Sequence, residues 1–374
     1  MLSCSQCLFT SENHPAIQLN AQGVCDICVI NAQNIQQIKG QKDPAYSAEM
    51  IQKIKASKKG KYDCLIGISG GTDSSYLVYL AKQWGLSPLL MHVDGGWNSE
   101  ISVINIERIV ENSGYDFVTE VLPWDEMRDM QRAFIDANVL DIDLPFDNAM
   151  LMYNYLVAKK YNIKYVINGY SIDTEGIMPS NFTHYKLDRR NLLDIHKRFG
   201  KVKLNKLKFI GTFSYWYWNR VEKIEFLHPL DWINYNKSEA KTIIQREFDW
   251  RDYGGKHYEN IFTRFYQGHI LPVKFGIDKR ISHLSMLICS GQLTKEEAQR
   301  QLESLPLYPN ELLQRDDQLF FMKKMQLTAE QMDLYLKTPP QSHRVFKSDL
   351  DYYDFFRPFY RFLKRVFQVN FFKK

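Results

Sequence analysis

The sequence contains no long hydrophobic run. No uninterrupted apolar stretch approaches the roughly 20 residues that a membrane-spanning helix needs. The N-terminus, Met1-Leu2-Ser3-Cys4, has no basic region followed by an apolar core, so no signal peptide is visible. We therefore expect a cytoplasmic protein, in which cysteines stay reduced and paired Cys motifs indicate a metal rather than disulfides.

A large excess of charge of one sign is also missing. The 48 Lys and Arg residues against 43 Asp and Glu residues give a net charge of +5. This mild bias favours anionic ligands such as nucleotides, and it is too small to predict nucleic-acid binding by itself. With 45% hydrophobic and 24% charged residues, the 374-residue chain has ordinary globular composition and a length that suits two or three domains.

Cysteine is scarce, and most of it is paired. Four of the six cysteines form two Cys-x-x-Cys knuckles: Cys4, Cys7, Cys25 and Cys28. Two such knuckles can direct four thiolates at one ion, which predicts a structural Zn²⁺ site closed by protein ligands. A redox pair is the alternative, but two knuckles in one short segment fit a zinc ribbon better. The other two, Cys64 and Cys289, lie in apolar runs and are expected in the core.

Short apolar runs alternate with helical patterns in the middle of the chain. Strands are predicted at 62–68, 89–93, 117–121 and 165–167, with helices between them. This alternation predicts an α/β fold with a doubly wound parallel sheet. Beyond about residue 235 the patterns are helical. We therefore expect a zinc ribbon at 1–40, an ATP-binding domain at 41–240 and a mainly helical domain at 241–374.

The first predicted strand ends in a glycine loop with the sequence Ser69-Gly70-Gly71-Thr72-Asp73-Ser74. Its glycines allow backbone N–H groups to approach a phosphate chain, and the following helix presents its positive N-terminus. The hydroxyl groups add donors, while Asp73 indicates a bridging Mg²⁺. The order differs from that of a P-loop NTPase. It resembles the SGGxDS signature of N-type ATP pyrophosphatases, which release pyrophosphate and transfer AMP to an oxygen.

Ligands of doubly wound sheets bind at the carboxyl ends of the strands. The second strand ends near His92 and Asp94, which we expect to border the nucleoside. The fourth strand is followed by residues that we expect to border the phosphates and the acceptor: Asn168, Gly169, Asp173 and Glu175. The alternatives are a turn aspartate for Asp94 and a polar surface loop for the two acidic residues.

The second half carries a longer signature. It consists of WRDYGGKHYE at 250–259, FTRFYQ at 262–267, LPVKFGIDKR at 271–280 and HLS at 283–285. Together with the knuckles and the loop, this resembles the bacterial N-acetyl sugar amidotransferases of O-antigen and flagellin sugar synthesis. The resemblance implies that an acetamido oxygen attacks the α-phosphate of ATP, after which ammonia replaces the adenylated oxygen to give an acetamidino group.

The segment 256–280 suits such a site. Its basic residues are Lys256, Arg264, Lys274, Lys279 and Arg280, which could neutralise phosphates or the nucleotide handle of a sugar. His257 and Glu259 could manage protons from ammonia. The alternative is an ordinary basic solvated face. The predicted catalytic residues are Asp73, Lys256, His257, Glu259, Lys274 and Arg280.

The resemblance also implies partners. No segment is left for a glutaminase domain, so the family implies a separate glutaminase and a cyclase-like ammonia-channel protein, both similar to subunits of imidazole glycerol phosphate synthase. The substrate is expected to be a nucleotide-linked N-acetyl sugar. The basic-aromatic tail at 355–367 has Arg357, Arg361, Lys364 and Arg365 on one helical face. It predicts either contact with an anionic membrane or docking on protein.

Two other functions share the loop. A tRNA-modifying enzyme, either a thiolase or a lysidine-type synthetase, is one of them. Thiolation needs a catalytic sulfur, and outside the knuckles only Cys64 and Cys289 remain, in apolar settings. The second is a nucleotide-binding zinc-ribbon adaptor without catalysis, which the intact loop disfavours.

Overall fold

The centre of the molecule is a parallel sheet of five strands in the order β3-β2-β1-β4-β5. The computed structural model describes residues 1–255 and 258–355. The strands are β1 (Cys64–Gly67), β2 (Pro88–Asp94), β3 (Phe117–Val121), β4 (Tyr165–Ile167) and β5 (Glu225–Leu227). The predicted α/β class with a parallel sheet is confirmed. The edge strand β5 was not predicted, because a run of three partly exposed residues gives no clear period.

The strand order creates a crevice at one edge of the sheet. From central β1 the chain moves to β2 and β3 on one side, and later to β4 and β5 on the other. Ile66 of β1 pairs with Leu90 of β2 and with Ile167 of β4, so the three strands end close together. In open α/β sheets such a switch point is where ligands bind. The glycine loop directly follows β1 at this edge.

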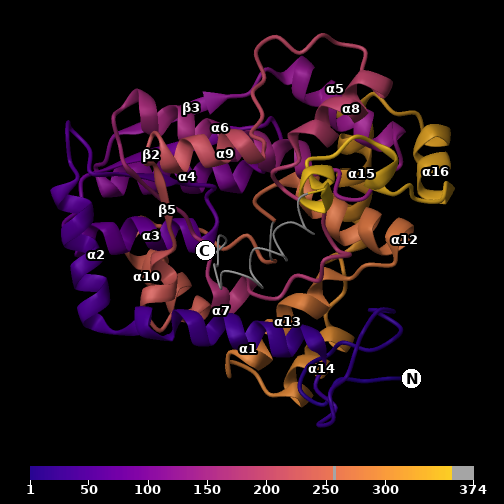
Figure 1. Cartoon of the computed structure of the whole chain (residues 1–374), viewed down its shortest axis with the longest axis horizontal. Coiled ribbons are helices and arrows are strands. Elements are labelled where there is room, and N and C mark those ends of the chain that lie inside the picture. Colours follow the sequence, from indigo (N-terminus) through magenta and orange to yellow (C-terminus); the bar gives the residue numbers. More distant parts are fainter. Residues whose placement is uncertain (256–257, 356–374) are drawn as a thin grey trace.

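Helices cover both faces of the sheet. Alternate residues of β1 point to opposite faces: Ile66 packs in the core under α3 and α10, and Leu65 packs in the core under α5 and α6. Figure 1 shows α3 and α10 on one side of the strands and α6 and α9 on the other. These covering helices are α2 (Pro44–Ala56), α3 (Thr72–Gln83), α4 (Glu100–Ser113), α5 (Trp124–Asp136), α6 (Leu144–Lys160), α9 (Thr212–Arg220) and α10 (Lys237–Phe248).

The part of the chain after the sheet is helical, as predicted. Within residues 1–255 and 258–355, no helix is long and apolar enough to cross a membrane. The remaining elements are α1 (Asp26–Ile38), η1 (Lys39–Lys42), α7 (Ile172–Glu175), α8 (Arg189–Phe199), η2 (Pro229–Trp232), α11 (Ile261–Phe265), the π-helix η3 (Tyr266–Ile270), α12 (Leu271–Phe275), α13 (Lys279–Cys289), α14 (Lys295–Ser304), α15 (Glu311–Met325), α16 (Ala329–Lys337) and η4 (His343–Val345).

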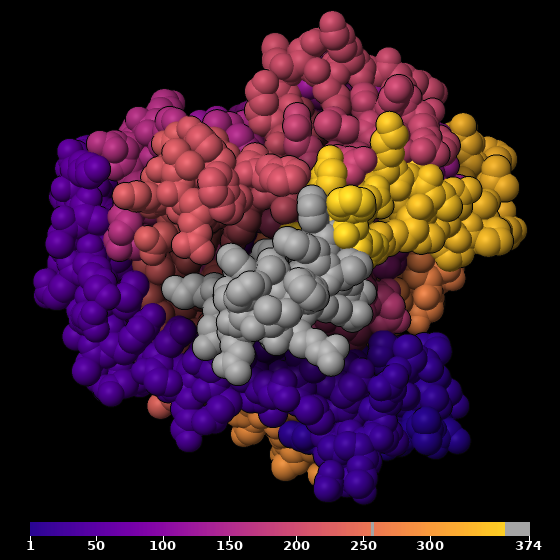
Figure 2. Space-filling model, in the orientation of Figure 1, coloured from indigo at the N-terminus to yellow at the C-terminus, as the bar shows by residue number. Residues whose placement is uncertain are grey.

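The N-terminal segment packs on the C-terminal helices. Lys295 at the start of α14 donates to the carbonyl oxygen of Cys4 at 2.6 Å, and the backbone N–H of Leu8 donates to Ser285 of α13 at 3.2 Å. In Figure 1, α1 lies beside α13 and α14. Figure 2 shows the N-terminal residues as an outer border along the lower and left sides of the molecule. The N-terminal segment thus contacts helices that lie far away in the sequence.

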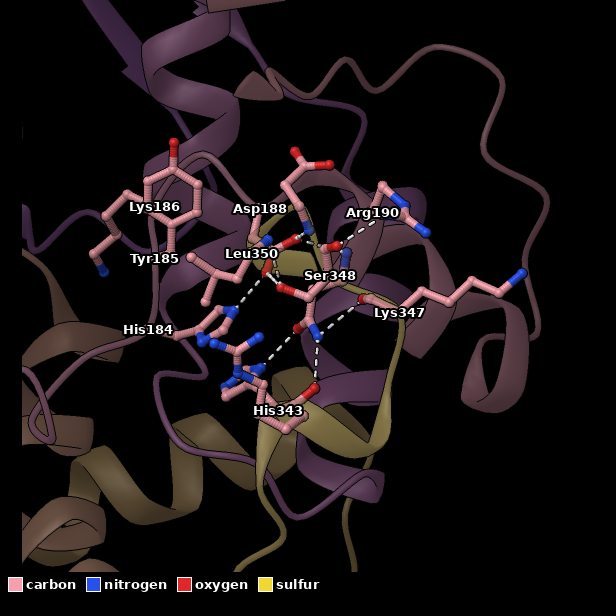
Figure 3. A network of polar contacts seen from close by, with 12 residues as sticks. His184, Tyr185, Lys186, Asp188, Arg190, His343, Lys347, Ser348 and Leu350 are labelled. Atoms are coloured by element: carbon pink, nitrogen blue, oxygen red, sulfur yellow. Dashed lines mark hydrogen bonds and ion pairs between the residues drawn. The ribbon is translucent and has the colours of Figure 1, made fainter. Parts of the chain in front are cut away.

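A buried polar network fastens residues 184–191 to residues 343–349 (Figure 3). Its centre is the Asp188 carboxylate, which caps α8 and accepts from His184 Nε2 at 2.8 Å, from the Ser348 hydroxyl and from the Asp349 N–H at 2.7 Å. His343 stacks on His184 with ring centroids 3.8 Å apart. Burial raises the pKa of Asp188, but these hydrogen bonds outweigh it and hold the pKa below its usual value.

Replacing Asp188 should therefore destabilise the fold. We expect Asp188→Ala to lower the free energy of unfolding by about 3 kcal/mol or more, because several buried donors lose their acceptor. Since the native pKa is below that of the unfolded chain, the contribution is present above the unfolded pKa and declines as the pH falls through the native value. Urea unfolding at neutral and acid pH measures both effects. Asp333→Ala, which removes an exposed ion pair, is the control. Equal stability of the two variants at neutral pH would contradict the assignment.

Candidate active site

The glycine loop is held in a conformation that only glycine permits. Gly70 has φ +76°, and a Cβ atom there would lie 2.5 Å from the carbonyl oxygen of Ser102 in α4. The carbonyl oxygen of Gly70 accepts from Trp250 Nε1 at 2.8 Å. The turn is thus fixed between α4 and the segment that follows α10.

The loop presents backbone donors at the start of α3. The N-cap residue of α3 is Gly71, which supplies no capping side chain. The N–H of Thr72 donates to the Tyr253 hydroxyl at 3.2 Å, and the N–H of Gly71 to Ser69 Oγ at 3.2 Å. Helix N-termini of this kind bind phosphate through N–H groups and the helix dipole. A phosphate that uses the Thr72 N–H must displace the Tyr253 hydroxyl.

Asp73 lies beside these backbone donors, and neighbouring side chains balance its negative charge. Its carboxylate accepts from the Tyr235 hydroxyl and from Lys237 Nζ, the latter at 3.2 Å. Burial lowers the pKa of Lys237, but the carboxylates of Asp73, Glu175 and Glu259 more than offset this and raise it above its usual value. Lys237 is therefore a permanent cation beside the loop. We call this the loop pocket; it is lined by Ser69, Gly71, Thr72, Asp73, Ser74, Glu175, Lys237, Tyr253 and Glu259.

The strand β2 ends in a short chain of hydrogen bonds. His92 donates from Nδ1 to the carbonyl oxygen of Ile68 at 2.9 Å, and its Nε2 accepts from Asn98 at 2.9 Å. The same Asn98 amide donates to Asp94 at 3.1 Å, and Asp94 also accepts from the Gly96 N–H. His92 and Asp94 thus lie together at the ligand edge, with Asp94 in a turn. Their predicted contact with the nucleoside remains a prediction.

The residues after β4 divide into two groups. A Cβ at Gly169 would lie 3.0 Å from the backbone nitrogen of Ser74, so this glycine packs directly on the loop. Asn168 accepts from His228 Nδ1 at 2.7 Å beside it, and Glu175 lines the loop pocket. Asp173 instead forms a 2.7 Å ion pair with Lys42, which turns its carboxylate toward the N-terminal segment.

The predicted basic residues are mostly engaged elsewhere. Lys274 is buried and donates to Asn138 at 3.0 Å and to the carbonyl oxygen of Tyr335, and burial lowers its pKa to about 8. Arg280 is paired with Asp278 at 2.6 Å. Neither residue lines the loop pocket, and their catalytic role remains a prediction. Lys256 and His257 lie outside the described residues. Glu259 does line the pocket, as expected for a residue of the site.

Sequence reasoning missed the side chains that complete the pocket. Tyr235 lies just before α10 and Lys237 is its first residue, and no motif indicated a role for either. Trp250 and Tyr253 belong to the WRDYGGKHYE segment, in which only the charged residues were predicted to take part in the site. Their place in this segment could have indicated a role, because the polar groups of Trp and Tyr can hold a loop by hydrogen bonds.

The four knuckle cysteines converge in one buried cluster. The sulfur atoms of Cys4, Cys7, Cys25 and Cys28 all lie within 4.8 Å of one another. Cys7 and Cys25 sulfurs are 3.7 Å apart, close to the ~3.8 Å between ligands of a tetrahedral site with Zn–S bonds of about 2.3 Å. Backbone N–H groups donate to these sulfurs, as from Cys25 to Cys4 at 3.3 Å. Such donors stabilise thiolates, so the cluster fits a structural Zn²⁺.

The two remaining cysteines differ from each other in position. Cys64 in β1 is fully buried, as expected. Cys289 is half-buried, and its sulfur lies 3.7 Å from that of Cys28. It therefore packs against the cluster rather than in the core of the sheet, which its apolar sequence setting did not indicate.

Comparison with known proteins identifies the C-terminal part. Residues 259–360 match the family described as LPS biosynthesis protein WbpG-like, C-terminal domain. This segment resembles the WbpG-like C-terminal domain. This confirms the expected relationship to lipopolysaccharide biosynthesis proteins. The WbpG-like residues begin at Glu259, so they include a residue of the loop pocket.

Two further relatives are either distant or matched over a short part of the chain. An uncharacterized protein of Methanocaldococcus jannaschii is 23% identical over 83% of this chain and 96% of its own length. A tRNA(Ile)-lysidine synthase of Chlamydia pneumoniae is 36% identical, but over 20% of this chain and 24% of its own length.

The solved structures that match this chain do so at low similarity. An NMN synthetase from Francisella tularensis has 16% identity and a TM-score of 0.38, covering 76% of this chain and 96% of its own. An NH3-dependent NAD synthetase from Campylobacter jejuni has 12% identity and a TM-score of 0.30, covering 82% of this chain and 99% of its own.

The loop geometry predicts a specific sensitivity at Gly70. Gly70→Ala should weaken ATP binding at least tenfold, because the added Cβ collides with the Ser102 carbonyl and the residue must keep a positive φ. Gly40→Ala is the control, since a Cβ there meets no atom within 4 Å. Titration calorimetry with a non-hydrolysable ATP analogue measures the difference. Unchanged affinity in Gly70→Ala would contradict the loop assignment.

The cysteine cluster predicts one bound zinc ion per chain. Cys25→Ser should lose the metal and lower the unfolding temperature, because a structural zinc site contributes folding free energy. Metal analysis and thermal unfolding of the purified protein measure both. Cys64→Ser is the control for losing a buried thiol, and it should keep the metal. Full zinc content in Cys25→Ser would refute a four-cysteine site.

Proposed function

We propose that the protein is an ATP-dependent amidotransferase of bacterial surface-polysaccharide synthesis. It would adenylate the acetamido oxygen of a nucleotide-linked sugar and replace that oxygen by nitrogen, giving an acetamidino group. The observation that carries this proposal is the loop pocket, with the SGGTDS backbone at the ligand edge of the sheet and Glu259 of the WbpG-like domain in its wall. The pocket supports cleavage of ATP, and the WbpG-like domain supports a sugar as acceptor.

The chemistry has two steps. The acetamido oxygen attacks the α-phosphorus of ATP; a P–O bond forms, the bond to the β-phosphate breaks, and pyrophosphate leaves. Ammonia then adds to the carbon of the O-adenylyl imidate, and AMP leaves with the former acetamido oxygen. The added nitrogen loses its surplus protons to nearby bases or water. The product is an amidine, AMP and pyrophosphate.

The described residues would serve the first step by binding and positioning. The N–H groups of Gly71 and Thr72 would hold the departing pyrophosphate, and the Lys237 cation would balance its charge. Asp73 would take part in holding Mg²⁺ together with the phosphates, because Mg²⁺ commonly binds one or two carboxylates plus substrate oxygens. The ion would supply charge neutralisation for the leaving group. Orientation of both reactants in one crevice would lower the barrier further.

The nitrogen source and the location of the protein are part of the proposal. We propose that ammonia comes from a separate glutaminase through a cyclase-like channel protein, as the family resemblance implies, and that the protein is cytoplasmic. The tail that predicted a membrane or docking contact begins at Phe355, and its residues 356–374 lie outside the described residues.

One assay tests the proposed activity. The wild-type protein is incubated with ATP, Mg²⁺, ammonium and UDP-linked N-acetyl and diacetamido sugars. The expected result is sugar-dependent formation of AMP and pyrophosphate. The mass of the sugar should change by the difference between an NH group and the oxygen atom that it replaces. Formation of ADP, or a rate of AMP release that does not depend on the sugar, would contradict the proposal.

The Asp73→Asn variant tests the role of the pocket. We expect it to lower the rate of AMP release about a hundredfold or more, because it removes a charge at the site of the leaving group. Asp333→Asn, on the surface of α16, is the matched control and should retain full activity. Circular dichroism and thermal unfolding show whether both variants are folded. A folded and active Asp73→Asn would remove Asp73 from the mechanism.

A tRNA-modifying function is the second candidate, since the local match to tRNA(Ile)-lysidine synthase favours it. The two functions differ in their acceptor. Copurifying RNA, or RNA-dependent AMP release in the same assay, would support tRNA modification. Sugar-dependent release without an effect of RNA would exclude it.

A further inference from the structure

A lysine of the WbpG-like segment contacts the turn that follows β2. The turn consists of residues 94–96, and Lys324 lies near the end of α15. Lys324 Nζ donates to the carbonyl oxygen of Gly96. Its ammonium group also lies over three aromatic rings, at distances to the ring centroids of 4.1 Å for Trp124, 4.9 Å for Trp97 and 5.4 Å for Phe320. The rings as well as the carbonyl group therefore hold this cation in place.

The turn fits against its neighbours because it lacks side chains. A Cβ at Gly95 would lie 2.4 Å from the ring of Phe146, and Gly96 has φ +78°. The N–H of Gly96 donates to Asp94 at 2.7 Å, while its carbonyl oxygen accepts from Lys324. The two peptide groups on either side of Gly96 thus have separate partners, and Lys324 is the partner that comes from α15.

The chain that follows the turn is bonded through its backbone to the wall of the loop pocket. The N–H of Ile261 donates to the carbonyl oxygen of Trp97, and the N–H of Ser99 donates to that of Glu259, both at 2.9 Å. Glu259 lines the loop pocket. Trp97, whose ring holds the lysine, therefore belongs to a backbone ladder that fixes a residue of the site.

A second path leads from the turn to the glycine loop. Asp94 accepts from the Asn98 amide at 3.1 Å, and the same amide lies 2.9 Å from His92 Nε2. His92 Nδ1 donates to the carbonyl oxygen of Ile68 at 2.9 Å. Ile68 directly precedes Ser69, the first residue of the loop. Side chains thus join the turn to the residue that leads into the loop.

The preceding residue of α15 provides a direct comparison. Lys323 is exposed, whereas Lys324 is partly buried. Burial lowers the pKa of Lys324, and the Asp94 carboxylate partly offsets this by raising it. Removing water from an ammonium group costs free energy, which the carbonyl group and the aromatic rings offset here. Lys323 is therefore a matched control for a charge at this end of the helix.

We propose that Lys324 is a positioning residue of the ATP site. By holding Gly96 and Trp97, it fixes the turn after β2 and the backbone of Glu259 in the geometry that a bound nucleotide requires. This inference rests on the ATP site of the proposed function, and it adds a contribution from α15 outside the loop pocket. Lys324 acts through these groups and is not placed against the nucleotide itself.

The first measurement is hydrogen exchange by mass spectrometry on the full chain without nucleotide. Lys324→Met keeps a long apolar side chain among the rings but removes the charge and the donor. The amides of Ser99 and Ile261, which are bonded in the backbone ladder, should exchange about tenfold faster or more, while those of β1 should change by less than about twofold. Lys323→Met should match the wild type. Faster exchange throughout the chain would indicate a general loss of stability and overturn the positioning role, as would unchanged exchange at both amides.

The second measurement is titration calorimetry with a non-hydrolysable ATP analogue and Mg²⁺. Lys324→Met should weaken binding about tenfold, because the turn and Glu259 lose a support of their position. Lys324→Arg should weaken it by less than about threefold, since a guanidinium group can donate to the carbonyl oxygen and stack on the rings. Lys323→Met should bind the analogue as the wild type does.

The outcomes separate this inference from the proposed function. Unchanged affinity in Lys324→Met, or an equal loss in Lys324→Arg or in Lys323→Met, would overturn the positioning role and leave the proposed function standing. No binding of the analogue by the wild type would overturn both. If Lys324→Met weakens binding as expected but the wild type forms no amidine with any sugar tested, the positioning role stands and the proposed function fails.

Discussion

The close approach of Gly70 to α4 is the constraint on which the site depends. With no Cβ, the Gly70 backbone lies against the Ser102 carbonyl, and its own carbonyl accepts from Trp250. These contacts tie the end of β1 to α4 and to the segment that follows α10. The N–H groups at the start of α3 are thereby directed into the crevice between β1 and β4, where Lys237 and Glu259 meet them. The pocket is a consequence of backbone packing more than of any single charged residue.

The cations of the molecule divide by what surrounds them. Lys274, Arg264 and Arg280 bind carbonyl or carboxylate oxygens of the chain and hold the C-terminal helices in place. Lys237 faces the loop, and Lys186 forms ion pairs with Asp141 and Asp147. The described cations therefore include residues that hold the fold together and one, Lys237, that lines the loop pocket. The groups that each cation contacts distinguish the two kinds, whereas the residue type does not.

The sequence was informative where a local rule applied. The strands β1 to β4, the SGGTDS turn and the cysteine cluster follow from periodicity, glycine placement and knuckle spacing, each of which acts within a few residues. The sequence did not predict contacts between segments that are distant along the chain. Tyr235 and Lys237, at and just before the start of α10, contact Asp73, and Lys42 pairs with Asp173, through packing that no local pattern encodes. The charged members of the 256–280 segment differ in position accordingly, since Glu259 lines the loop pocket and Lys274 and Arg280 do not.

The central claim is that the acetamido oxygen is transferred to AMP. It is tested most directly with a nucleotide-linked N-acetyl sugar whose acetamido group carries isotopically heavy oxygen. The protein is supplied with this sugar, ATP, Mg²⁺ and ammonium, and the AMP is analysed by mass spectrometry. The account predicts heavy oxygen in the phosphate of AMP and an amidine on the sugar. AMP without the label, beside a sugar that has lost its oxygen, would contradict it.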